Sequence, residues 1–238
     1  KHPHFHAKGR TTPSFGVSND KFRFDGRRVR LPIIGWVRTR EPLRFDGKIL
    51  SGRATFHRGR WHLAVQVAMP AEYNRPQAPA ETLVGVDLGV KVLATLSDGP
   101  PIENPRALRS AQKRLHRAVL AVARKRRAAD CRLGPRKKGE RREASRRLQR
   151  ASRRLARVHV AVAAVRNDAI HKATTRIAST WRTVVVEDLA VKNMTRRVHG
   201  KGRAAKAGLN RSILDAGFAE FRRQLAYKLP LHGGTLVV

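Results

Sequence analysis

The spacing of apolar residues divides the chain into a strand-rich first part and a longer remainder. Over residues 21–70, apolar and polar residues alternate in short runs separated by polar turns, the pattern of half-buried strands. One turn falls at Asp25-Gly26 and another at residues 57–60. Four or five such strands predict a small barrel or curled sheet. The runs are Phe22–Leu31, Ile34–Arg38, Ile49–Phe56 and Trp61–Val67.

Beyond residue 81 the pattern changes to longer apolar runs and helical spacing. Residues 71–81 are rich in proline and alanine and indicate a linker. The runs Thr82–Asp87 and Thr183–Glu187 are nearly continuous in apolar residues, as expected of central strands. Val92–Ser97 predicts a second strand after the first, and a last strand begins near Thr235. Before that last strand, the Gly-, Lys- and Arg-rich residues 188–211 indicate a loop, and Ser212 is expected to cap a helix that runs to about Lys228.

Residues 104–179 have the periodicity of two long helices. Apolar residues recur every seven positions in both halves of the segment, and breakers at residues 131–139 separate the halves. Two heptad-patterned helices joined by a short connection predict an antiparallel hairpin. The two series are Leu108, Leu115 and Val122, and Leu148, Leu155 and Val162.

Together these elements predict a multi-part α+β and α/β fold. Residues 1–70 form a partial β-barrel-like domain, residues 71–81 a linker, and residues 82–238 a second domain. That second domain has a mixed sheet, of the RNase H-like type by its order of elements, with the helical hairpin 104–179 inserted. Because the run that starts at Thr235 stops at Val238, we expect the sheet to be incomplete at the C-terminus.

Charge narrows the possible functions. The 238 residues carry 52 Lys and Arg against 17 Asp and Glu, a net charge of +35, which favours a polyanionic partner such as nucleic acid. A single cysteine, Cys131, excludes an internal disulfide and a cysteine-based zinc site within these residues. No apolar run is long enough to span a membrane and no signal peptide is visible, so we expect a cytoplasmic protein.

The helical segment carries about half of this charge. Residues 106–157 hold 21 Lys and Arg against 3 Asp and Glu, a net +18. A charged helix is commonly just a solvated face, but so one-sided a bias favours a hairpin that lies along a phosphate backbone. The candidate nucleic-acid-binding residues, including two in a later basic loop, are Arg124, Lys125, Arg126, Arg127, Lys137, Lys138, Arg196 and Arg197.

Two isolated acids lie on the apolar strands. Asp87 ends the first run and Glu187 the third. A carboxylate on a central strand is costly to bury unless it is paired or binds a metal, and in a basic protein a metal-binding pair suits two-metal phosphodiester chemistry with Mg²⁺. The alternative is structural, with Asp87 capping a turn and Glu187 pairing with an arginine.

Several stretches resemble the TnpB (OrfB) family of transposon-encoded, RNA-guided DNA endonucleases. The segment Val84–Gly99 closely resembles the family's first RuvC motif, and Val184–Met194 resembles the second. Asn210–Asp215, followed by Phe221–Leu225, is similar to the family's helix after that motif. Arg27–Val37 is similar to part of the family's β-barrel, or wedge, domain.

The resemblance implies a site and its partners. Asp87 matches the family's first catalytic aspartate and Glu187 its catalytic glutamate, both as Mg²⁺ ligands, whereas Asp188 is expected to point to the opposite face. Guide RNA and target DNA are the implied partners, with base pairing supplying most of the specificity. The family's four-cysteine zinc segment and third RuvC aspartate have no counterpart within these 238 residues, which predicts a fragment with an incomplete metal site.

Three functions therefore compete. The first is an RNA-guided, Mg²⁺-dependent DNA endonuclease of a mobile element. The second is a truncated, catalytically inactive remnant that only binds RNA or DNA. The third is an unrelated basic RNA-binding or ribosome-associated protein, which would not need acids at the ends of apolar strands.

Overall fold

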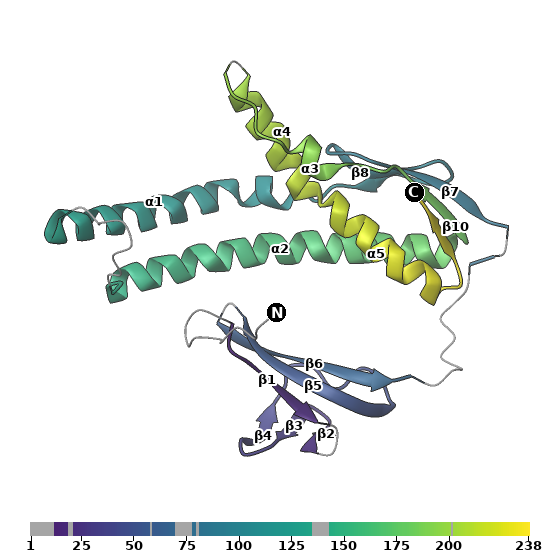
Figure 1. The fold of residues 1–238 in the computed structure, drawn as a ribbon, viewed down its shortest axis with the longest axis horizontal. Coiled ribbons are helices and arrows are strands. Elements are labelled where there is room, and N and C mark those ends of the chain that lie inside the picture. The colour runs from purple at the N-terminus through teal and green to yellow at the C-terminus, as the bar shows by residue number, and fades with distance from the viewer. Residues whose placement is uncertain are drawn as a thin grey trace, which may run out of the picture. The chain divides into compact units, whose positions relative to one another are not determined.

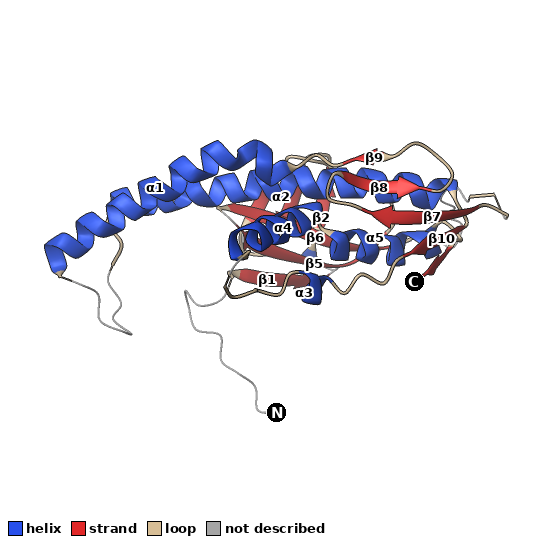
Figure 2. Ribbon diagram, turned by 90° about the horizontal axis from the view of Figure 1, so that it is seen from above, coloured by secondary structure: helices blue, strands red, loops and turns tan. Residues whose placement is uncertain are grey.

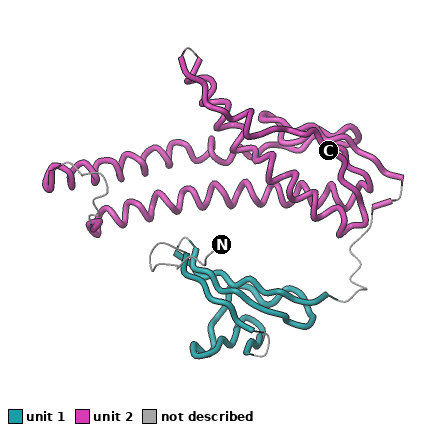
Figure 3. The backbone as a smooth tube through the Cα atoms, in the orientation of Figure 1, with its two compact units in different colours: residues 1–73 teal, residues 74–238 magenta. Residues whose placement is uncertain are grey.

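The computed structural model describes residues 12–18, 21–57, 59–69, 78–79, 81–134, 143–200 and 202–238. The chain divides into two compact units, residues 1–73 and 74–238, which are shown in different colours in Figure 3. Each unit has its own hydrophobic cluster.

The first unit consists of two three-stranded antiparallel sheets, in the orders β1-β5-β6 and β2-β3-β4. Their inner faces share one cluster of apolar side chains, with Val17 and Val29 at its centre. The ring of Phe22 lies directly over Gly52, where an added Cβ would be only 2.7 Å from Cζ of Phe22. The strands are β1 (Ser14–Ser18), β2 (Arg23–Asp25), β3 (Arg28–Leu31), β4 (Gly35–Arg38), β5 (Lys48–His57) and β6 (Arg60–Ala68).

The turn between β3 and β4 is strained. Ile33 has φ of +65°, a left-handed conformation that is unfavourable for a β-branched residue, and its side chain is fully exposed. The turn is closed by a short hydrogen bond from the Ile34 N–H to the Pro32 carbonyl, 2.6 Å. The conformation is therefore imposed by the geometry of the hairpin and not by side-chain packing.

We expect Ile33→Gly to raise the free energy of unfolding by up to about 1 kcal/mol. Glycine removes a left-handed penalty of about 1–2 kcal/mol, partly offset by its greater freedom in the unfolded chain. Urea unfolding of the full chain measures the change. Ile34→Gly is the matched control, because Ile34 is also exposed but has negative φ, and it should destabilise. Equal effects of the two changes would contradict the argument.

The second unit is built on a five-stranded mixed sheet in the order β11-β10-β7-β8-β9. Strands β11, β10 and β7 are parallel, whereas β8 and β9 continue the sheet antiparallel. Figure 2 shows β9, β8, β7 and β10 side by side in that order. The strands are β7 (Leu83–Leu88), β8 (Val92–Leu96), β9 (Ile102–Glu103), β10 (Thr183–Val186) and β11 (Thr235–Val237).

Helices cover one face of this sheet. The main cluster packs Val84 and Val184 of the sheet against Ile177 of α2 and Phe221 of α5. The part of α2 that precedes this cluster lies beside α1 (Figure 1). There Ala111 of α1 packs with Val158 and Val162 of α2. The helices are α1 (Ala107–Leu133), α2 (Arg146–Thr180), α3 (Val191–Met194), α4 (Arg203–Ala216) and α5 (Phe218–Leu231).

A buried lysine joins α2 to α5. Lys228 is almost fully buried, and a charged group in that position needs hydrogen-bond partners. Its ammonium group donates to the hydroxyls of Thr174 and Thr175 at 2.7 and 2.8 Å and to the His171 carbonyl at 2.9 Å. Partial burial, together with the nearby Lys228 charge, lowers the pKa of His171. The lysine thus fixes the angle of α5 on α2.

A carboxylate from α4 caps the start of α1. Arg106, the residue before α1, is left-handed and has no capping side chain. Instead both carboxylate oxygens of Asp215 accept the Leu108 N–H, at 2.9 and 3.1 Å, and Arg166 of α2 lies 3.9 Å from the same carboxylate. Because Asp215 is only 8% exposed, these interactions are shielded from water.

We expect Asp215→Ala to lower the free energy of unfolding by about 2 kcal/mol, the sum of a lost helix cap and a lost buried charged hydrogen bond. Urea unfolding of the full chain checks this. Asp168→Ala is the control, because Asp168 pairs only with Lys172 on the exposed surface of α2 and should cost less than about 0.5 kcal/mol. A loss no larger than the control's would rule out the capping role.

The coarse prediction of mixed sheets with helices is confirmed, and both long helices are present near the expected positions. Two local expectations are wrong. Residues 188–211 are not a continuous loop, because α3 and most of α4 lie there. Ser212 does not begin a helix, because Gly217 with φ of +74° separates α4 from α5. Among the described residues, no helix is long and apolar enough to cross a membrane.

Candidate functional site

The two acids predicted from the sequence lie next to each other in the structure. Strands β7 and β10 are parallel neighbours, with Val86 in register with Val186. Asp87 is the next residue of β7, and Glu187 is the residue that directly follows β10. Adjacent strands are about 4.8 Å apart and residues in register share a face. The register therefore brings together two carboxylates that are a hundred residues apart in sequence.

The carboxylates are on the face of the sheet that the helices leave uncovered. Val86 and Val186 point into the core, so the next residue on each strand points away from it. Asp87 and Glu187 line an open hollow of about 430 Å³. Thr95, the cross-strand neighbour of Asp87, lines the same hollow. The hydroxyl of Ser97 accepts the Gly85 N–H at 2.9 Å and ties β8 to β7 there.

Neither structural alternative for these acids is seen. In the described part of the chain, no ion pair or side-chain hydrogen bond involves Asp87 or Glu187. A pair of exposed carboxylates without a cation suits a divalent metal, because Mg²⁺ takes oxygen ligands and keeps several waters. No His, Cys, Asp or Glu side chain in the described ranges joins the pair to make a group of three.

The neighbouring acid, Asp188, is engaged elsewhere. Its carboxylate accepts a hydrogen bond from Arg222 of α5 at 2.5 Å, and the pair is exposed. Asp188 is therefore an ion-pair partner that holds the end of β10 against α5.

A second feature is a basic trough between α1 and α2. Its floor is made of small residues, including Ala118, Ala121 and Ala151, which let the two helices approach closely. Six cations form its walls, and none of them has a carboxylate partner in the ranges that the structure describes. The six cations of the trough are Arg114, Arg117, Lys125, Arg147, Arg150 and Arg154.

The structure separates the basic residues predicted from the sequence. Four consecutive residues on a helix point in four directions, so the run 124–127 cannot form one surface. Lys125 lines the trough, whereas Arg126 and Arg127 line a hollow on another side of α1. Arg124 and Lys125 line a third hollow near the end of the hairpin. Lys137 and Lys138 lie outside the described residues.

Arg196 and Arg197 follow α3 and are exposed. The backbone just before them is held from α4, where Lys206 donates to the Met194 carbonyl at 2.6 Å and Asn210 to the Thr195 carbonyl at 2.8 Å. The two arginines therefore project from an anchored turn.

Most of the trough lies outside the set of basic residues predicted from the sequence. That set consists of runs of consecutive basic residues, and five of the six trough cations are not in it. The signal that finds them is helical spacing, since Arg147, Arg150 and Arg154 recur at intervals of three and four beside the apolar stripe.

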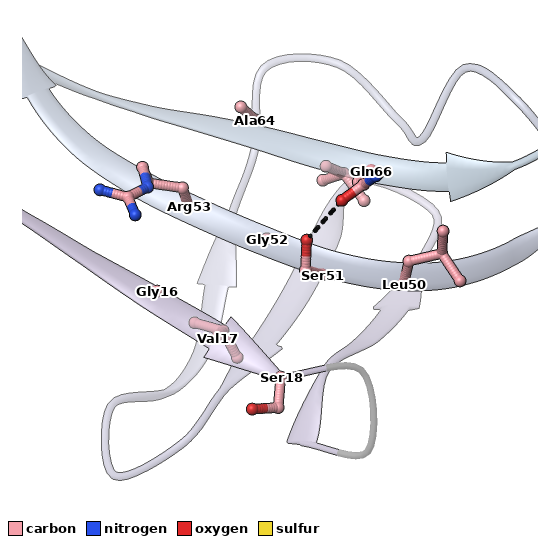
Figure 4. A pocket seen from close by; sticks show the side chains of 10 residues that line it. Gly16, Val17, Ser18, Leu50, Ser51, Gly52, Arg53, Ala64 and Gln66 are labelled. Atoms are coloured by element: carbon pink, nitrogen blue, oxygen red, sulfur yellow. Dashed lines mark hydrogen bonds between the residues drawn. The ribbon is translucent and has the colours of Figure 1, made fainter.

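The first unit has a hollow of its own, on the outer face of the sheet β1-β5-β6 (Figure 4). Its floor is backbone at Gly16 and Gly52, and a hydrogen bond of 3.0 Å joins Ser51 to Gln66 across it. Among the described residues that line it, Arg53 is the only charged one, and none is an acid, a histidine or a cysteine of the kind that acid–base or metal chemistry needs.

The comparison with known proteins identifies the family. Residues 62–198, more than half of the chain, match the family described as "Probable transposase", OrfB of the IS605 type. The chain therefore belongs to this transposase-associated family. The match includes both β7 and β10, and with them Asp87 and Glu187.

Named relatives are similar over most of this chain. The protein described as "Putative RNA-guided DNA endonuclease InsQ" of Escherichia coli (strain K12) is 34% identical over 92% of this chain and 54% of its own length. The "Putative RNA-guided DNA endonuclease Rv2885c" of Mycobacterium tuberculosis is also 34% identical, over 99% of this chain and 50% of its own length. The chain thus spans about half the length of the curated relatives it matches.

Among solved structures, the chain is similar to a Cas12f1–sgRNA–target DNA complex. The identity is 14%, with a TM-score of 0.45 over 79% of this chain and 35% of that one. A second structure, a CRISPR-Cas12f ternary complex, is 16% identical with a TM-score of 0.31.

Proposed function

We propose that the chain is the nuclease part of an RNA-guided, metal-dependent DNA endonuclease of a mobile element. The observation that carries this proposal is the register of β7 and β10, which puts Asp87 and Glu187 side by side on an uncovered sheet face. Family membership supports it, because the relatives are described as RNA-guided DNA endonucleases.

The sheet order also supports the proposal. If the five strands are numbered in chain order, from β7 as strand 1 to β11 as strand 5, their order across the sheet is 3-2-1-4-5. Each neighbouring pair among strands 1 to 3 is antiparallel, and strands 4 and 5 are parallel to strand 1. This order suits an RNase H-like, RuvC-type domain over residues 82–238, with the helical pair α1 and α2 inserted between the third and fourth strands. Residues 1–70 then form the wedge-type nucleic-acid-binding domain, and residues 71–81 the linker.

The carboxylate pair fits Mg²⁺ by the chemistry of its donors. Asp87 and Glu187 would hold the ion, and the substrate's phosphate oxygens and waters would complete the ligand set. When bound, the metal supplies an activated water and stabilises the leaving oxygen. The chain's own residues keep the two carboxylates in register, because the core below β7 and β10 holds both strands rigidly.

The partners are guide RNA and target DNA. The trough between α1 and α2 gives a phosphate backbone six cations that have no competing carboxylate among the described residues. Such contacts recognise the backbone and not the bases, so that pairing with the guide supplies the sequence specificity. These partners imply that the protein works in the cytoplasm, at the nucleoid.

The test uses the chain together with the RNA that it retains on purification. That RNA is sequenced, and a plasmid carrying the complementary sequence is incubated with the complex in Mg²⁺ or in EDTA. Cleavage within the complementary region in Mg²⁺ alone is the expected result. Cleavage of plasmids without the complementary sequence would overturn the guided mechanism.

A binding-only remnant is the second candidate. It is favoured by one observation, that no third acidic, histidine or cysteine side chain in the described residues joins the pair. In the same experiment a remnant would retain RNA and bind the plasmid without cutting it in either condition.

A further inference from the structure

The outer face of the sheet β2-β3-β4 in the first unit combines an aromatic ring with unpaired cations. Cross-strand partners share a face, so the register defines two rows of side chains. One row is Asp25, Arg28 and Arg38, and the other is Arg23, Arg30 and Trp36. The residues between them, Phe24, Val29 and Leu31, point into the core.

Trp36 is the apolar centre of this face. Its side chain is 50% exposed, and the guanidinium of Arg28 lies 5.6 Å from the ring centroid. That arginine is itself fixed by an ion pair with Asp25 at 2.5 Å. The guanidinium thus lies over the ring, while about half of the Trp36 side chain stays open to solvent.

The charge of this face is unbalanced. Arg23, Arg30 and Arg38 are exposed, and none has a carboxylate partner within the residues that the structure describes. Beside Trp36, the strained turn adds the exposed side chains of Ile33 and Ile34. An apolar patch rimmed by arginines is the combination that stacks a base and binds the phosphates on either side of it.

We infer that this face, the Trp36 platform, binds an unpaired stretch of RNA with one base stacked on the Trp36 ring. Single-stranded RNA suits both features of this face, because its unpaired bases can stack on the ring and its phosphates can pair with the arginines. RNA is favoured over DNA, because the 2′-hydroxyl of RNA is a further hydrogen-bond acceptor for arginine.

The inference rests on the proposed guide RNA, and it deepens that proposal by placing a contact outside the nuclease unit. The other exposed tryptophan of the first unit, Trp61, is a natural control. Its ring packs against Phe15 and Phe56, at centroid distances of 5.8 and 5.3 Å, on the other sheet. The third tryptophan, Trp181, is buried in the core of the second unit.

The first experiment measures tryptophan fluorescence of the full chain with a uridine decamer. In the Trp61→Phe variant, Trp36 reports binding, and the expected result is quenching at saturation. In the Trp36→Phe variant, Trp61 reports binding, and its signal should stay constant. Equal quenching in both variants, or none in the first, would overturn the inference.

The second experiment measures affinity. Trp36→Ala should weaken binding of the uridine decamer about tenfold or more, and Trp61→Ala should leave it nearly unchanged. An abasic decamer with the same phosphates should bind wild type and Trp36→Ala equally, which separates stacking from charge. A deoxyuridine decamer should bind more weakly than the uridine decamer. Equal or tighter DNA binding would overturn the RNA assignment.

The experiments distinguish a failure of the Trp36 platform from a failure of the proposed guided cleavage. Quenching by the decamer needs neither Mg²⁺ nor Asp87, so the platform can be real in a chain that never cuts DNA. Conversely, guided cleavage with an unresponsive Trp36 would reject the platform alone.

Discussion

Asp87→Asn is expected to lower the rate of guided DNA cleavage at least a hundredfold while leaving nucleic-acid affinity within about twofold of wild type. The substitution keeps the size of the side chain but removes the charge that holds a divalent ion, and metal stabilisation of the transition state is worth several kcal/mol. Glu187→Gln should have a similar effect, because the register makes the two carboxylates one ligand set. Cleavage rates and filter binding measure the two quantities.

Asp188→Asn is the matched control, since it removes an adjacent exposed carboxylate that pairs with Arg222 instead of lining the hollow. It should keep most of the cleavage rate. If Asp87→Asn reduced affinity and thermal stability together, Asp87 would be a structural residue. If Asp188→Asn matched its loss of cleavage, the site would have been assigned to the wrong face of β10.

Neutralising three cations of the trough is expected to weaken binding of an RNA–DNA duplex about a hundredfold or more near 0.1 M salt. The triple variant is Arg117→Gln, Arg150→Gln and Arg154→Gln. Each phosphate contact contributes about 0.7–0.9 to the slope of log affinity against log salt, so the slope should become shallower by about 2–3. Glutamine keeps the helix propensity, and the side chains are exposed, so folding should be unaffected.

The control removes the same charge from the same two helices away from the trough, as Arg109→Gln, Arg153→Gln and Arg157→Gln. These exposed residues do not line the trough. The control should lose much less affinity and keep a slope close to wild type. Equal losses would mean that the net charge of the hairpin, and not the trough, binds the duplex.

Elements defined by strong periodicity could be predicted from the sequence. The alternating runs gave the strands β2 to β6, and the heptad spacing gave α1 and α2. Strand β1 was missed because Ser14–Ser18 is short and carries only two large apolar residues, Phe15 and Val17, and its pairing with β5 could not be read from the sequence. The start of α4 was missed because the basic and glycine-containing segment before it is typical of a loop, whereas Lys206 and Asn210 hold it against the end of α3.

The candidate site divides in the same way. Asp87 and Glu187 could be found because an acid at the end of an apolar run is conspicuous in any sequence. Helical spacing indicates only the α2 side of the trough, and nothing in the sequence indicates the Trp36 platform, because both surfaces depend on which residues of separate elements face the same side. That information is in the pairing of α1 with α2 and in the register of β3 with β4.

Helix α2 has a mechanical consequence for the whole second unit. Its 35 residues form one uninterrupted helix, about 52 Å long at 1.5 Å per residue. One end carries Arg147 and Arg150, and the other is buried under the sheet and leads directly into β10 and Glu187. The helix is therefore a rigid connection between the basic trough and the strand that precedes Glu187: a displacement of the trough end of α2 is transmitted along the helix to β10.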